Sequence, residues 1–169
     1  TRITIGLCMI LALSSLSQAT VTLNPAPKGT ARCSRFSMTV NGRECFVYDA
    51  QIPRDRMNRV PPTTCSFAIV DADEPVTIAV TSTRAVDDYV LRPRNIDFDA
   101  GRSGDTITFV AKKPGKIVLT VNSPTLYPLF IIFNPPEESP PREGDANVRY
   151  FGPGIHDLNE EIRFNSNET

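Results

Sequence analysis

The feature that most restricts the fold of this sequence is a series of short runs in which apolar and polar residues alternate. Residues 36–40, 76–81, 106–111 and 117–121 have this pattern, and residues typical of turns separate them. Alternation with a period of two places the apolar side chains on one face of a strand. No segment has a clear helical period, and the 15 prolines also favour turns. We therefore expect about nine or ten short strands and an all-β fold, an antiparallel β-sandwich.

The dipeptide Asn41-Gly42 lies between two of these runs and is a strong signal for a two-residue hairpin turn. Such a turn pairs Val40 with Arg43 and Met38 with Cys45. We expect residues 53–64, which are rich in Arg and Pro, to form an exposed loop, and residues 101–104 to form a turn.

A boundary is expected after the apolar run at residues 129–133 (LFIIF). A run without alternation predicts a central strand that is buried on both faces. Asn134-Pro135-Pro136 ends it, because paired prolines cannot continue a sheet. We expect a sandwich over residues 20–136, an acidic, Pro-rich linker over 137–146, and a new unit from Asn147 that begins with a short strand at 148–151.

Residues 1–19 resemble a signal peptide. Arg2 supplies a positive charge, residues 3–13 are apolar, and Ser17-Gln18-Ala19 has the pattern of a cleavage site. The apolar stretch is short for a membrane span. We predict a secreted, extracellular protein that starts near Thr20; a buried N-terminal strand or helix is the alternative.

Cleavage at this site removes Cys8 and leaves three cysteines, Cys33, Cys45 and Cys65. An odd count permits at most one internal disulfide. The hairpin register places Cys33 far from the position opposite Cys45, which disfavours that pair. Bridges between Cys33 and Cys65 or between Cys45 and Cys65 stay open, and so do three free thiols.

Several acidic residues deserve comparison with known site chemistry. Asp71, Asp73 and Glu74 could ligate calcium, but no glycine-centred loop or later bidentate Glu completes a calcium site, so a solvated turn is the simpler interpretation. Asp97 and Asp99 could share a face as a carboxylate pair, but their neighbours indicate an exposed loop.

The other site chemistry is sparse. His156 is the single histidine, which argues against a Ser-His-Asp triad and against a metal site with several histidine ligands. Beside Asp157 it could act in acid–base chemistry, although a structural role fits better. The chain has four tyrosines and no Trp, which weakens a carbohydrate-binding platform. A net charge of −1 without a basic cluster argues against nucleic acid or an anionic membrane as a partner.

The end of the chain carries a family resemblance. Residues 148–157 (VRYFGPGIHD) and then 161–169 (EIRFNSNET) resemble the first coil of the right-handed parallel β-helix in glycoside hydrolase family 49, the dextranases and isopullulanase, and in related polygalacturonase-like enzymes. Residues 90–93 and 129–136 are similar to strands of the β-sandwich that precedes that helix. The resemblance spans roughly residues 20–169 and is strongest from Tyr89 onward.

The resemblance implies an N-terminal fragment of a secreted polysaccharide-degrading hydrolase, truncated within the first coil of the β-helix (residues 147–169). The catalytic aspartates of that family lie on later coils, so no catalytic, cofactor-binding or metal-binding residue is assigned here. The polysaccharide substrate is expected to bind through the missing β-helix domain, and the protein is expected to be a monomer without a cofactor. A stand-alone secreted binding or adhesion module is the alternative, and a lyase on a similar scaffold is a third possibility.

Overall fold

The computed structural model describes residues 20–52, 63–123, 127–159 and 161–166, and in this part of the chain all regular structure is β. A helix able to cross a membrane is absent from these residues. The strands are β1 (Val21–Thr22), β2 (Phe36–Val40), β3 (Arg43–Cys45), β4 (Tyr48–Ile52), β5 (Thr63–Ala72), β6 (Val76–Ser82), β7 (Tyr89–Arg92), β8 (Gly101–Ser103), β9 (Thr106–Ala111), β10 (Gly115–Val121) and β11 (Leu129–Asn134).

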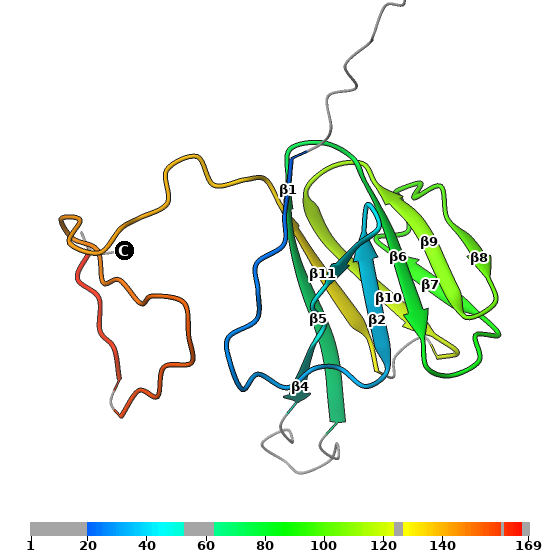
Figure 1. Ribbon diagram of the computed structural model, residues 1–169, viewed down its shortest axis with the longest axis horizontal. Coiled ribbons are helices and arrows are strands. Elements are labelled where there is room, and N and C mark those ends of the chain that lie inside the picture. The colour runs from blue at the N-terminus through cyan, green and yellow to red at the C-terminus, as the bar shows by residue number, and fades with distance from the viewer. Residues whose placement is uncertain (1–19, 53–62, 124–126, 160, 167–169) are drawn as a thin grey trace, which may run out of the picture.

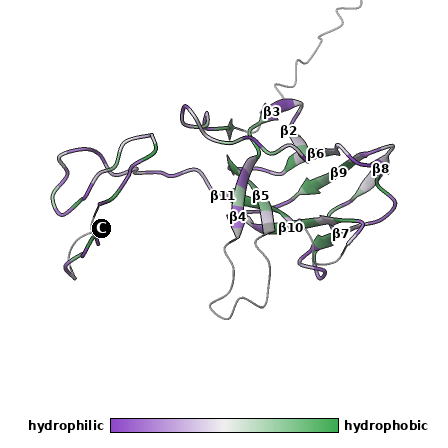
Figure 2. Ribbon diagram, turned by 90° about the horizontal axis from the view of Figure 1, so that it is seen from below, coloured by the Kyte–Doolittle hydropathy of each residue, from purple (hydrophilic) through white to green (hydrophobic). Residues whose placement is uncertain are grey.

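The strands form two sheets that face each other, which confirms the predicted all-β sandwich (Figure 1). The six-stranded sheet has the order β1-β5-β11-β10-β7, with β4 also paired to β5, and the five-stranded sheet has the order β3-β2-β6-β9-β8. The hydrophobic residues gather in the strands of the sandwich (Figure 2). Residues of both sheets, among them Met38, Ile78, Phe109, Leu119 and Ile131, are almost fully buried between them.

The sandwich is not wholly antiparallel, because β11 runs parallel to β5, with Leu129 opposite Ser66 and Phe133 opposite Val70. A parallel pair needs a long connection. Strands β6 to β10, most of which lie in the other sheet, supply that connection here. Alternation of apolar and polar residues cannot distinguish parallel from antiparallel pairing, so the sequence analysis did not predict this parallel pair.

The predicted hairpin is confirmed in its register: Val40 lies opposite Arg43, and Met38 lies opposite Cys45. Asn41 and Gly42 have positive φ angles of 48° and 77°, as a two-residue turn of this kind requires. The turn is also tied to the next strand of its sheet, because the Thr77 amide donates to Asn41 Oδ1 over 2.8 Å.

This turn gives a first testable expectation. In Gly42→Ala the new Cβ would meet no atom within 4 Å, so the cost is purely conformational. An L-residue in the left-handed region costs roughly 1–2 kcal/mol, and we expect that loss in the free energy of unfolding measured by urea denaturation. Gly101→Ala is the matched control, since its Cβ also meets nothing and its φ is ordinary. An equal loss in both variants would contradict the assignment of the turn.

Strand β11 is central, as predicted, since it lies between β5 and β10. The expectation that both of its faces are buried is wrong. Leu129, Ile131 and Phe133 face the core, whereas Phe130 on the opposite face is 38% exposed. Ile132 on the same face is half-buried, so the uninterrupted apolar run has one buried face and one partly exposed face.

Three further expectations differ from the structure. Residues 148–151 form no strand, and they pair with no strand in the part of the chain that the structure describes. Residues 101–103 form strand β8 rather than a turn, which falls at Gly104. Thr63 and Thr64 belong to β5, while the rest of the expected 53–64 loop and the expected signal peptide at 1–19 lie outside the described residues.

The three cysteines that the structure describes are free thiols, so neither bridge left open by the sequence is formed. Cys33 Sγ lies 3.0 Å from the Ser66 hydroxyl, and this contact joins the segment before β2 to β5 inside the core. Cys45 is buried, and this burial raises the pKa of its thiol to about 11. A protonated, buried thiol is a poor nucleophile, so Cys45 acts as a small core residue.

Candidate functional site

Asp71 and Asp73, which the sequence analysis considered as calcium ligands, accept hydrogen bonds that hold the sandwich together. Asp71 accepts hydrogen bonds from Asn24 Nδ2 over 3.2 Å and from Asn134 Nδ2 over 3.1 Å. Asp73 accepts from the Thr20 amide over 3.2 Å. These bonds tie the residues that flank β1 to the end of β5, and β5 to the end of β11. Within the described ranges, no group of three or more His, Cys, Asp or Glu side chains is placed to hold a metal ion.

Asp97 and Asp99 lie on the same side of an exposed loop and share one cation. Lys112 Nζ is 2.9 Å from Asp99 Oδ2 and 4.0 Å from Asp97 Oδ2. The hydrogen bond from Lys112 and the attraction of its charge lower the pKa of the Asp99 carboxyl below its ordinary value of 3.8. A general acid needs a raised pKa, so Asp99 is unsuited to that role.

Replacing Lys112 by Ala is therefore expected to raise the pKa of Asp99 toward 3.8. A carboxyl whose pKa is lower in the folded state stabilises the fold above its unfolded pKa and loses that effect as the pH falls through the folded value. The variant should thus lose less stability on acidification. A carboxyl-detected NMR titration measures the midpoint, and Lys113→Ala is the control. An unchanged midpoint in Lys112→Ala would contradict the ion pair.

His156 and Asp157 lie in the segment that follows β11 and leaves the sandwich (Figure 1). His156 Nε2 is 2.7 Å from the Gly152 carbonyl oxygen, and its ring meets the Phe151 ring edge-on with 5.5 Å between centroids. These contacts close a local turn. They give His156 the structural role that the sequence favoured.

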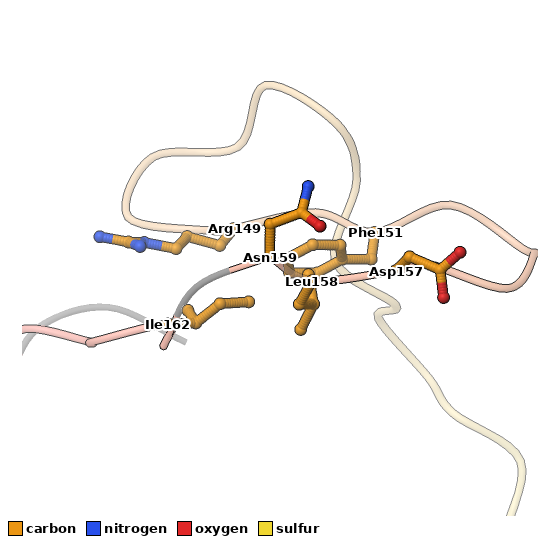
Figure 3. A pocket seen from close by; sticks show the side chains of 6 residues that line it. All are labelled: Arg149, Phe151, Asp157, Leu158, Asn159 and Ile162. Atoms are coloured by element: carbon orange, nitrogen blue, oxygen red, sulfur yellow. The ribbon is translucent and has the colours of Figure 1, made fainter.

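The same segment contains an open pocket of about 370 Å³ (Figure 3). Arg149 lies on one side and Asp157 on the other, and Phe151, Leu158 and Ile162 form its apolar part. The apolar side chains of this segment are unusually exposed: Phe151 is 47% exposed and Leu158 is 57% exposed. A pocket with such walls is an unfinished packing surface rather than a formed active site.

The second apolar surface is the outer face of the six-stranded sheet, a feature that the sequence did not reveal. Tyr48, Phe67 and Phe130 form one row across β4, β5 and β11, because each lies opposite the next. Ile69 and Ile132 form the next row. Ile69 is 36% exposed and Phe130 is 38% exposed. We call these five residues the outer apolar face.

The rings of this face are arranged for packing. Tyr48 and Phe67 stack on each other, with 4.6 Å between centroids and planes 6° apart. One flat face of each ring is therefore covered by the other ring, so the two rings do not lie side by side as a platform for a sugar ring. The linker leaves beside this face, where Ile69, Asn134 and Pro135 line a hollow of about 460 Å³. The apolar residues at positions 130 and 132 are the sequence pattern that could have indicated this surface.

Comparison with known proteins bears on the fold. No family model and no curated protein matches this sequence. Nine chains of solved structures match in fold. One of them is Dex49A from Penicillium minioluteum, a dextranase of glycoside hydrolase family 49, with a TM-score of 0.50 and 15% sequence identity.

The aligned region covers 75% of this chain and 33% of the Dex49A chain. The chain thus spans about a third of the length of that structure. At this level of identity the similarity establishes a shared fold, and the fold is distantly similar to that of a family 49 dextranase.

Proposed function

We propose that this chain is the N-terminal part of a secreted, polysaccharide-degrading glycoside hydrolase of the dextranase type, in which the sandwich is a non-catalytic accessory domain. The observation that carries the proposal is the fold similarity to Dex49A, which extends over most of this chain but only a third of that enzyme. The motif resemblance at residues 148–169 points to the same family independently of the fold.

The organisation in this proposal has four parts. Residues 1–19 are a signal peptide, 20–136 the sandwich, 137–146 a linker and 147–169 the first coil of a β-helix. A parallel β-helix buries its apolar residues only when successive coils stack. This explains why Phe151, Leu158 and Phe164 are exposed and why their segment has no strands.

The chemistry in this proposal belongs to the β-helix. An inverting hydrolase uses one carboxylic acid to protonate the leaving oxygen and one carboxylate to activate water. Two of the carboxylates in the sandwich have structural partners instead: Asp71 accepts hydrogen bonds from two Asn side chains, and Asp99 forms an ion pair with Lys112. The sandwich therefore contributes packing, and its outer apolar face is the surface that the later coils would cover.

Assays on the 169-residue chain and on the complete product of its gene test this proposal. The 169-residue chain should release no reducing ends from dextran, whereas the complete product should hydrolyse an α-glucan. NMR of the first product should show an inverted anomeric configuration. Hydrolysis by the 169-residue chain alone would contradict the proposal. Binding of dextran by a complete product that never hydrolyses it would favour a stand-alone binding module instead.

A further inference from the structure

We propose that a second site, a pocket at one end of the sandwich, binds the oxyanion of a small molecule between Arg35 and Arg84. The pocket has a volume of about 210 Å³, and its lining includes Phe36 and Ser82, which lie opposite each other where β2 begins and β6 ends. Figure 1 shows these two strands side by side. Phe36 and Val121 form its apolar floor between the two sheets, and Arg35, Arg84 and Tyr127 stand around its rim. This site does not depend on the proposed hydrolase function.

The charges around this pocket are unbalanced. Among its described lining residues are two arginines and neither an aspartate nor a glutamate. In the described part of the chain, the salt bridges formed by Arg, Lys or His side chains do not include Arg35 or Arg84. Two cations at a concave site with an apolar floor produce a local positive potential that concentrates anions.

Arg35 is held in place by an aromatic ring. Its guanidinium carbon lies 3.5 Å from the centroid of the Tyr127 ring. A ring in this position attracts the cation and orients its plane, but it leaves the net charge unchanged. The edge of the guanidinium group keeps its N–H donors, whose fork geometry matches the two oxygens of a carboxylate or those of an inorganic oxyanion.

The main chain beside the arginines is fixed by hydrogen bonds. The Thr83 amide donates to the Arg35 carbonyl over 2.9 Å, and the Thr83 hydroxyl donates to the Ser34 carbonyl over 3.2 Å. The Arg84 amide donates to the Ser82 hydroxyl over 3.1 Å. These bonds hold the start of β2 and the end of β6 together, so the two arginines project from a rigid frame.

The opposite wall of the pocket is fixed by Asn122. Its Oδ1 accepts from the amides of Asp87 and Asp88 over 2.8 and 3.1 Å, and its Nδ2 donates to the Ala85 carbonyl over 2.7 Å. The main chain around the pocket is therefore already fixed before a small molecule enters, which lowers the cost of ordering the site.

The volume and the lining define the class of ligand. About 210 Å³ is smaller than the 300–1,000 Å³ typical of drug-sized ligands. It suits a single small ring or a short acid with its oxyanion between the arginines and its less polar part over Phe36 and Val121. A sugar acid and a free inorganic oxyanion share this chemistry, and the experiment distinguishes them.

Amide NMR titrations of the 169-residue chain test the site at constant ionic strength with D-glucuronate, D-glucose and sodium sulfate. We expect saturable shifts at Arg35, Thr83 and Arg84 with glucuronate or sulfate, with Kd on the order of 1 mM. Glucuronate alone would identify a sugar acid, and sulfate alone a free inorganic oxyanion. No saturable shift with either anion, or equal shifts with neutral glucose, would overturn the proposal.

Substitutions locate the anion. Arg84→Ala removes an exposed side chain and should keep the fold while weakening binding about tenfold, and Arg35→Ala should weaken it at least as much. The matched control is Arg94→Ala, an exposed arginine in the turn after β7 at the other end of the sandwich, which should leave Kd unchanged. Binding that survives both Arg84→Ala and Arg35→Ala would overturn the assignment. Loss of hydrolase activity in the complete product has no bearing on these results.

Discussion

Replacing Phe109 by Ala is expected to lower the free energy of unfolding by about 3–5 kcal/mol. Phe109 is fully buried between the two sheets, and its ring meets the Phe98 ring edge-on with 5.8 Å between centroids. Truncation removes this contact and leaves a cavity that the rigid strands on both sides cannot fill. Urea denaturation followed by circular dichroism measures the loss. The expected loss is a large share of the roughly 5–15 kcal/mol by which a typical domain is stable against unfolding.

The control for this prediction is Phe130→Ala, the same chemical change on the outer face of the sheet. Phe130 is already 38% exposed in this structure. Its truncation creates no enclosed cavity, so we expect a loss of about 1 kcal/mol or less. A loss as large as that of Phe109→Ala would mean that the outer apolar face is covered in the isolated chain, contrary to the structure.

The second large effect is expected at the outer apolar face of the complete gene product. Phe130→Asp should leave the 169-residue chain folded, because the new carboxylate is in contact with water. If later coils pack on this face, the same change buries a charge at the contact and removes an apolar side chain that contributes about 1.5–3 kcal/mol. Separation of the sandwich should then become at least tenfold more frequent.

Limited proteolysis with a Glu-specific protease reports this separation, because Glu137, Glu138 and Glu143 lie in the linker. We expect cleavage of the Phe130→Asp product to be at least tenfold faster than that of the unaltered product. Thr108→Asp, on the exposed side of the other sheet, is the matched control and should change the rate little. Equal cleavage rates for Phe130→Asp and the unaltered product would show that this face is not the docking surface.

Local patterns predicted the parts of this fold that local interactions determine. The Asn41-Gly42 turn sets its own register, so the pairing of Met38 with Cys45 could be read from the sequence. The alternation in residues 76–81 likewise gave the buried face of β6. Parallel pairing of β11 with β5 depends on the path of the chain through the second sheet, and no local pattern encodes that path.

The candidate surfaces were harder to predict for a related reason. The outer apolar face consists of residues from three strands that become neighbours only through sheet pairing. The apolar run at 129–133 was interpreted as burial on both faces, because a sequence pattern cannot say whether a covering domain is present. Arg35 precedes β2 and Arg84 follows β6, and the pairing of these two strands brings both residues to one pocket. Neither arginine stands in a recognisable motif.

The measurement that tests the central claim most directly is the reading frame of the transcript beyond Thr169. The proposal predicts that it continues through several further β-helix coils that carry clustered aspartates, as a hydrolase of this type requires. A stop codon directly after Thr169 would contradict the proposal. The protein would then be a β-sandwich without a catalytic β-helix, and binding assays would have to find its function.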